Sequence, residues 1–194
     1  MTNTKYRLIP EDYKEICGKK LYRIEALKDF GDVKAGDLGG YIESEDNLSH
    51  DGNAWVYGNA WVRDNACVRD NACVRDNAWV YGDACVGGDA CVRDNARVRD
   101  NAVVCNNAII RDNARIGDKA MIRDNAMIRD NAMIRDNAVI RGSAMICDNG
   151  CVGGDAWVYS NARIGDNAAV CNNASWFIVG PIGSRDDFTT FFFG

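Results

Sequence analysis

The stretch that decides the fold is Ala54-Trp-Val-Tyr-Gly-Asn-Ala-Trp-Val-Arg-Asp-Asn-Ala-Cys-Val-Arg-Asp-Asn71, in which alanine recurs every six residues. The same six-residue unit continues without an insertion to Asn173, so residues 54–173 hold twenty hexads. A repeat this regular indicates a solenoid, in which each unit buries its apolar side against its neighbours.

Two positions of the hexad are apolar. The first residue is Ala in every hexad except the one that begins at Gly150, and the third is always Val or Ile. Residues two apart point to the same side of a strand, so both positions face a common core. The fifth and sixth residues are mostly Asp-Asn or Gly-Asn, which favour tight turns and tolerate positive φ. Each hexad is therefore predicted to be one short strand and one corner, with Asn and Asp ladders running between coils.

Three hexads make a triangular coil of 18 residues, and successive coils stack at the spacing of neighbouring strands, about 4.8 Å. Twenty hexads then correspond to about 6.7 coils and a prism roughly 32 Å long. An amphipathic helix is excluded because a strict period of six does not follow 3.6 residues per turn. We predict an all-β, single-domain parallel β-solenoid with short caps.

The segments outside the repeat are predicted to be these caps. Residues 1–53 form the N-terminal cap and an irregular first coil, because Ile42 and Leu48 are six residues apart. The apolar segment that begins at Leu21 is expected to cover the open end of the prism. Residues 174–194 are predicted to be a C-terminal cap, closed by Trp176, Phe177 and the run Phe188–Phe193.

Charge and hydropathy argue against several classes of binding partner and location. The net charge is −5, but residues 54–173 carry 14 Lys and Arg against 15 Asp and Glu, which gives no general electrostatic reason to bind DNA or membrane surfaces. No run of about 18 apolar residues is present, and the N-terminus lacks the features of a secretion signal. We predict a cytoplasmic protein.

The nine cysteines do not suggest a metal or disulfide framework. Their number is odd, no Cys-x-x-Cys occurs, and the chain has a single histidine. Zinc sites and disulfide scaffolds have other spacings, so reduced thiols are expected and no metal or cofactor is predicted.

The Val-Arg-Asp-Asn-Ala pattern resembles the hexapeptide-repeat family, whose fold is the left-handed parallel β-helix. The handedness is implied by this resemblance alone. Asp32–Ser49 resembles the N-terminal cap of a bacterial and prophage subfamily usually named as transferases, and Gly183–Phe192 resembles its C-terminal module. In similar proteins that module continues further, so a truncated C-terminus is one expectation.

Hexapeptide acyltransferases, suggested by analogy of fold, use a histidine as general base near a loop that leaves the coils. Here the lone histidine, His50, precedes the regular coils, and no loop interrupts the hexads. His50 is therefore a weak catalytic candidate, more simply explained as a residue of the cap.

Outward positions flank each inward Val or Ile, and residues 18 apart form columns on three faces. Face 1 begins with Trp55, face 2 with Trp61 and face 3 with Cys67. Columns of Met, Val, Ile, Cys and Trp predict contact surfaces, and similar proteins are commonly trimers. The cysteines at 67, 85, 73 and 91 are interpreted as small interface residues rather than disulfides.

Face 2 combines aromatic rings with the densest arginines, which suits a nucleotide-like anion: rings stack on a base and guanidinium groups bind phosphate. The alternative is that each arginine neutralises the aspartate that follows it. The predicted ligand-binding residues are Trp61, Arg63, Trp79, Tyr81, Arg97, Arg99 and Arg115.

Three functions follow. The first is a non-enzymatic, homo-oligomeric scaffold of phage or prophage type, most simply a homotrimer, that binds or sequesters a small anionic ligand between subunits. The second is an acyltransferase that uses a coenzyme A thioester and His50. The third is a purely structural, self-assembling solenoid.

Overall fold

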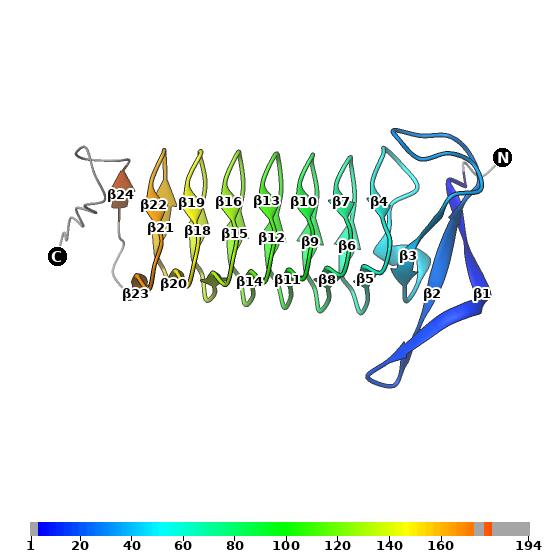
Figure 1. Cartoon of the computed structure of the whole chain (residues 1–194), viewed down its shortest axis with the longest axis horizontal. Helices are drawn as coiled ribbons and strands as arrows, with labels where there is room; N and C mark the ends of the chain where they lie inside the picture. The colour runs from blue at the N-terminus through cyan, green and yellow to red at the C-terminus, as the bar shows by residue number, and fades with distance from the viewer. Residues whose placement is uncertain (1–3, 173–176, 180–194) are drawn as a thin grey trace.

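The computed structural model describes residues 4–172 and 177–179, and these are almost entirely β-structure with one 3-10 turn, η1 (Glu45–Asn47). Residues 54–172 wind into stacked triangular coils (Figure 1). Strand neighbours are 18 residues apart and parallel, as in Trp61 against Trp79, which confirms the coil length. The solenoid is a left-handed β-helix. The expected C-terminal cap at Trp176 and Phe188–Phe193 lies outside the described residues.

Three sheets form the faces of the prism, with seven strands along each face, and three strands of the N-terminal cap extend the sheet of face 2 to ten. Face 1 contains β4 (Trp55–Val56), β7 (Cys73–Val74), β10 (Cys91–Val92), β13 (Ile109–Ile110), β16 (Met127–Ile128), β19 (Met145–Ile146) and β22 (Arg163–Ile164). Face 2 contains β5 (Trp61–Val62), β8 (Trp79–Val80), β11 (Arg97–Val98), β14 (Arg115–Ile116), β17 (Met133–Ile134), β20 (Cys151–Gly154) and β23 (Ala169–Asn172). Face 3 contains β6 (Cys67–Val68), β9 (Cys85–Val86), β12 (Val103–Val104), β15 (Met121–Ile122), β18 (Val139–Ile140), β21 (Trp157–Tyr159) and β24 (Phe177–Val179).

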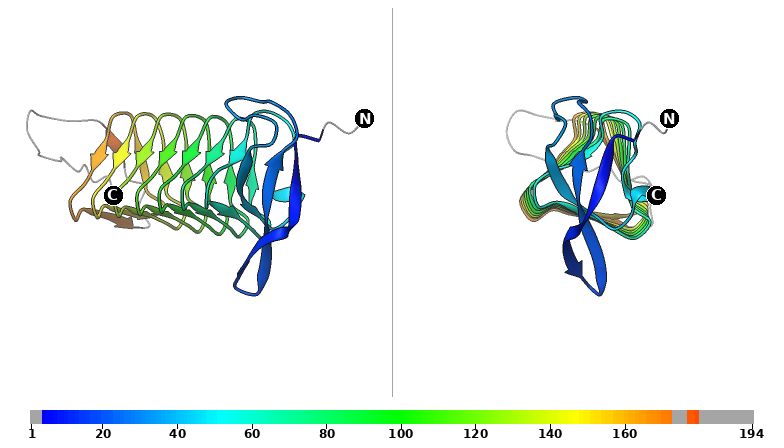
Figure 2. Two further views of the ribbon diagram at one scale, coloured as in Figure 1. Left: turned by 45° about the vertical axis from the view of Figure 1, so that its right-hand side comes forward. Right: turned by 90° about the vertical axis from the view of Figure 1, so that its right-hand side faces the viewer.

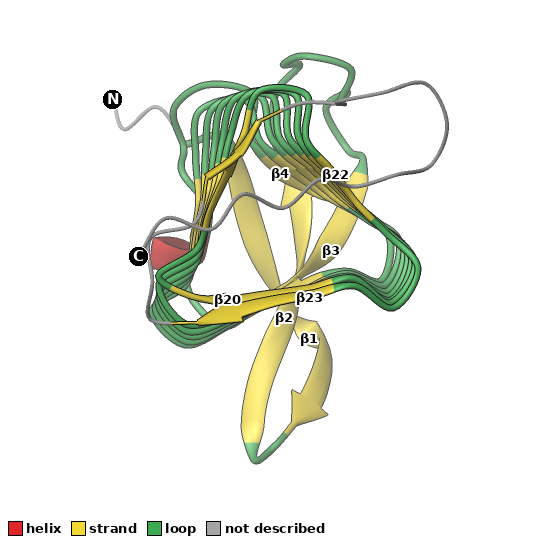
Figure 3. Ribbon diagram, turned by 90° about the vertical axis from the view of Figure 1, so that its left-hand side faces the viewer, coloured by secondary structure: helices red, strands yellow, loops and turns green. Residues whose placement is uncertain are grey.

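The core is the column of first-position and third-position residues, as the period predicts. The third-position side chains from Val56 to Val158 are fully buried, and so are the alanines from Ala54 to Ala156. A view along the prism shows the three walls enclosing a narrow interior (Figure 3). Burying each Val or Ile contributes roughly 1.5 to 3 kcal/mol before entropy is subtracted, which explains why no other residue type occupies this position.

From Gly58 to Asp166, every corner turns at the fifth residue of the hexad, which has positive φ. In most hexads this residue is aspartate, for example Asp112 with φ of 60°. Its side chain also accepts a hydrogen bond from the corner of the next coil, as Asp112 Oδ2 does from the amide of Asp130 at 3.2 Å. The sixth residue forms a second ladder, in which Asn113 Nδ2 donates to Asn131 Oδ1 at 3.3 Å. The predicted ladders are confirmed.

Replacing Asp112 by alanine is expected to destabilise the protein by about 2 kcal/mol, because alanine disfavours positive φ and the inter-coil hydrogen bond is lost. Asp112→Gly removes the same hydrogen bond but tolerates the backbone, so it should cost about 1 kcal/mol less. Urea unfolding followed by circular dichroism measures both. Equal losses for the two variants would show that backbone strain at the corner is not the cause.

The N-terminal cap covers one end of the prism. Strands β1 (Tyr6–Ile16) and β2 (Lys19–Ala26) form an antiparallel hairpin, and β3 (Leu38–Ile42) joins β2 to β5. The hairpin crosses the end of the coils and extends past the triangle (Figure 2). Leu21 and Ile24 of β2 are fully buried.

An irregular first coil links this cap to the repeat. Ile42 pairs with Val62, and Leu48 bridges to Val68, as their six-residue spacing suggests. Asn47 is fully buried at the turn, where Nδ2 donates to the carbonyls of Asp64 at 2.9 Å and Ala66 at 2.8 Å. Its Oδ1 accepts hydrogen bonds from two backbone amides, so every polar group of the side chain is satisfied.

Among the described residues, no helix has the length and apolar character needed to cross a membrane.

Candidate functional site

Face 2 begins beneath the hairpin of the cap. Trp61 is only 6% exposed and packs with Leu21 and Tyr41 in an apolar cluster. Trp79 and Tyr81 lie against the edge of the same cluster. This part of face 2 is therefore a packed junction between the cap and the coils.

The aromatic rings of face 2 stack on one another. The rings of Trp61 and Trp79 are 4.7 Å apart and inclined by 29°, and the guanidinium of Arg97 lies 3.9 Å from the centre of the Trp79 ring. Since the three residues belong to successive coils, Trp79 is held between the other two. The coil spacing of about 4.8 Å is close to a stacking distance, so neighbours in a column cover one another.

Arg63 is also engaged within the chain. Its guanidinium lies 4.9 Å from the centre of the Tyr81 ring and pairs with Asp64 at 3.1 Å. Trp61, Arg63 and Trp79 are therefore engaged in contacts within the chain, and they support the site structurally. The stacking planes that the sequence suggested for a ligand are used by the protein itself.

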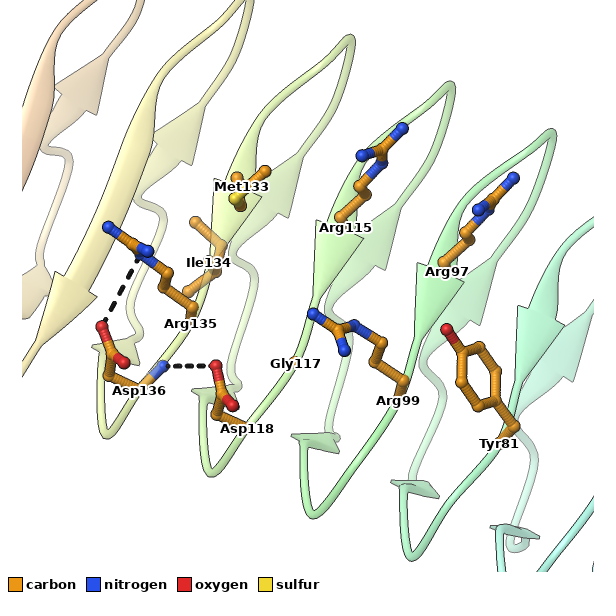
Figure 4. Close-up of a pocket in the computed structure, with 10 residues that line it drawn as sticks. All are labelled: Tyr81, Arg97, Arg99, Arg115, Gly117, Asp118, Met133, Ile134, Arg135 and Asp136. Carbon is orange, nitrogen blue, oxygen red and sulfur yellow. Dashed lines mark hydrogen bonds and ion pairs between the residues drawn. The ribbon is translucent and has the colours of Figure 1, made fainter.

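Further along face 2 lies an open depression of about 360 Å³ (Figure 4). Four of the predicted residues line it, namely Tyr81, Arg97, Arg99 and Arg115. The remaining lining residues were not predicted from the sequence, and they are Gly117, Asp118, Met133, Ile134, Arg135 and Asp136. The signal was Gly117, which interrupts the fourth-position column between Arg99 and Arg135. A Cβ at this position would lie 3.2 Å from Arg99 Nε, so the missing side chain makes room for that arginine.

The arginines of this depression differ in their partners. Fourth-position arginines pair with the next aspartate, as Arg99 does with Asp100 at 3.2 Å and Arg135 with Asp136 at 3.7 Å. Eight arginines of the repeat show this pairing: Arg63, Arg69, Arg75, Arg93, Arg99, Arg111, Arg129 and Arg135. The neutralising arrangement is thus confirmed for these eight arginines.

Arg97 and Arg115 are different because they occupy the second position of the hexad. Neither forms an ion pair with any carboxylate of the described residues, and Figure 4 shows both guanidinium groups extending from adjacent strands on the same side of the depression. The carboxylate of Asp118 meanwhile accepts the amide of Asp136 at 3.2 Å. The depression therefore holds uncompensated positive charge, which suits an anion.

His50 lies in the cap and does not line the depression. Its Nδ1 accepts a hydrogen bond from the amide of Lys5 at 3.2 Å, and its ring stacks on Tyr6 with centres 4.3 Å apart. Nε2 is 3.9 Å from a carboxylate oxygen of Glu45. These contacts explain His50 as a packing residue of the cap. None of them involves an arginine of face 2.

One group of potential metal ligands occurs among the described residues, formed by Asp130, Cys147 and Asp148. Its atoms already have partners in the corner ladder. Asp130 Oδ2 accepts the amide of Asp148 at 3.2 Å, and the Cys147 thiol donates to Asp148 Oδ2 at 3.1 Å. The group is explained by the architecture of the corner.

The apolar columns of the prism are less exposed than the sequence suggested. Most second-position residues are half-buried in the single chain, because neighbours 18 residues apart shield one another. Among the described repeat residues, the large apolar side chains that remain exposed are Met133 and Trp157, at 38% and 40%.

The repeat and the three parallel sheets are those of a hexapeptide-repeat left-handed β-helix, and two sequence matches agree with this fold. A family model described as "Bacterial transferase hexapeptide (six repeats)" matches residues 107–142. The chain is also similar to the "Uncharacterized acetyltransferase YdcK" of Escherichia coli (strain K12), with 45% identity over 60 residues. That match covers 27% of this chain and 18% of the relative, so it spans less than a fifth of that protein. The prophage subfamily stays a prediction.

Proposed function

We propose that the protein is a β-solenoid binding protein whose depression on face 2 binds the phosphate groups of a nucleotide-like ligand. The observation that carries this proposal is the pair Arg97 and Arg115, which face the depression without carboxylate partners. Guanidinium groups bind phosphate through two parallel hydrogen bonds, and the phenol of Tyr81 adds a polar ring at the same rim. No catalytic side chain is required for this role, and the prophage-type resemblance fits sequestration of a nucleotide.

Self-association belongs to the same proposal. The columns of β12 to β19 on faces 1 and 3 present Val103, Ile109, Met121 and Met127, which are only half-buried in one chain. Packing copies side by side as a closed trimer would cover these columns.

The second candidate function is acyl transfer from a coenzyme A thioester. The matches to a transferase repeat model and to a protein named as an acetyltransferase favour it. Coenzyme A carries a nucleotide phosphate, so the same arginines would bind it. The depression lacks a histidine, and His50 is held by Lys5 and Tyr6 in the cap, so binding without catalysis remains our first choice.

Isothermal titration of the purified protein with ADP, inorganic phosphate and acetyl-coenzyme A tests both functions. Arg115→Gln should weaken nucleotide binding about tenfold, since a hydrogen bond to a charged group contributes roughly 1.5 to 3 kcal/mol. Arg111→Gln, which removes an arginine paired with Asp112 on face 1, should leave binding unchanged.

Two results would reject the binding proposal: no affinity for any of the three probes, or equal weakening by both variants. Release of free coenzyme A together with an acetylated acceptor, abolished by His50→Ala, would instead establish the acyltransferase.

A further inference from the structure

Two pairs of cysteines face each other across neighbouring coils near the capped end of the prism. Cys67 is registered with Cys85 on face 3, and Cys73 with Cys91 on face 1. All four occupy the second position of the hexad and are partly accessible. Cys151 holds the same position on face 2 but is registered with Met133 and Ala169, so the pairing is not a general property of the column.

The geometry of the Cys67–Cys85 pair is close to that of a dithiol about to form a bond, and the Cys73–Cys91 pair has the same register. The sulfur atoms of Cys67 and Cys85 are 3.2 Å apart. Registered parallel strands lie about 4.8 Å apart, which is inside the Cα separation range of roughly 4.4 to 6.8 Å found in disulfides. The backbone is held in this register, because the amide of Cys67 donates to Ala84 at 2.9 Å and that of Cys85 to Ala102 at 2.9 Å. Rotation of the side chains is therefore enough to bring the sulfurs together.

Each pair favours one thiolate beside one thiol. The thiol of Cys67 donates to Cys85, which lowers the pKa of Cys85 to about 6, and the nearby charge of Arg69 acts in the same direction. Cys73 does the same for Cys91, whose pKa falls to about 7 with help from Arg75 and Arg93. The pKa of the donating partner is raised correspondingly. A thiolate next to a thiol is the arrangement needed for attack on a disulfide and for resolution of the product.

We propose that Cys67 with Cys85 and Cys73 with Cys91 are two dithiol sites that are oxidised to inter-coil disulfides by a small-molecule disulfide such as oxidised glutathione. The thiolate attacks one sulfur of the reagent, forms a mixed disulfide and expels one thiolate. The partner cysteine then loses its proton to solvent and attacks the protein sulfur of the mixed disulfide, expelling the second thiolate. Each pair loses two electrons and two protons, and the reagent is reduced to two thiols.

The positions of the pairs give the modification a structural meaning. Counting regular coils from Ala54, a bond between Cys67 and Cys85 would join the first coil to the second. A bond between Cys73 and Cys91 would join the second coil to the third. The same three coils carry Trp61, Trp79 and Arg97, the stack that leads into the depression. Oxidation would thus link the coils that support the candidate anion site covalently. This inference does not depend on what that site binds.

The test is to incubate the folded protein with oxidised glutathione, block the remaining thiols under denaturing conditions, and analyse it by mass spectrometry without reduction. We expect the loss of two hydrogen atoms per pair, and cross-linked peptides that connect Cys67 to Cys85 and Cys73 to Cys91. Cys67→Ser should stop oxidation at the mixed disulfide on Cys85 while leaving the other cross-link intact. Cys17, the exposed cysteine among those whose burial the structure describes, provides an internal control, because it should carry glutathione.

Stable glutathione adducts on the paired cysteines, cross-links between different copies, or four unreacted thiols would each overturn the proposal. The peptide map of the unmodified sequence is decisive by itself, so the result does not depend on the folding of any variant.

Discussion

Replacing Ile110 by aspartate is expected to destabilise the protein by more than about 4 kcal/mol, enough to disrupt the central coils. Ile110 is fully buried in β13, and its neighbours across the coils are Val92 and Ile128. A carboxylate at this position would have no hydrogen-bond donor and no opposite charge, since the interior of the coils around Ile110 contains only aliphatic side chains. Because each coil contacts only the next, the defect should remain centred on the coils around residue 110.

The adjacent residue supplies a matched control. Ile109 is the same amino acid in the same strand, but it points outward and is half-buried, so Ile109→Asp should cost about 1 kcal/mol or less. Thermal unfolding by circular dichroism and hydrogen exchange of the coil amides measure both variants. Comparable losses of stability would mean that the assigned inward and outward sides of the strand are wrong.

Reversing the charges of Arg97 and Arg115, which have no carboxylate partner among the described residues, is expected to have a large effect on ligand affinity. The double variant Arg97→Glu with Arg115→Glu should bind ADP at least about 100-fold more weakly, because two hydrogen bonds of roughly 1.5 to 3 kcal/mol each are lost and repulsion is added. Titration calorimetry at fixed ionic strength measures the difference, and circular dichroism checks that the fold is retained.

The control changes the net charge by the same amount elsewhere. Arg111→Glu with Arg129→Glu lies on face 1, where both arginines are paired with the following aspartate. We expect this variant to bind ADP with nearly the affinity of the unmodified protein. If both double variants lose affinity equally, the binding reflects overall charge and the depression on face 2 is not the site.

The candidate site was only partly predictable because it depends on what lies beside each residue in the next coil. Trp61 and Trp79 were correctly placed on one face, yet their rings stack with each other and with Arg97 and so are not open to a ligand. Likewise Arg99 and Arg115 are both outward arginines, but one has a carboxylate within reach and the other does not. The stacking arises from side-chain conformation, which a period of six does not specify, whereas the difference between the two arginines follows from their hexad positions, fourth for Arg99 and second for Arg115.

By itself the sequence determined the architecture: the coil length, the buried and outward positions, the turn at each corner and the ladders of Asp and Asn. These features are local and repeat twenty times, so every hexad imposes the same backbone and the same inward side chain. Only the tertiary structure decided which side chains are available. It did so through the hairpin over Trp61, the depression lined by Arg97 and Arg115, and the 3.2 Å approach of Cys67 to Cys85. Each of these depends on contacts between side chains that lie far apart along the chain, and packing alone sets them.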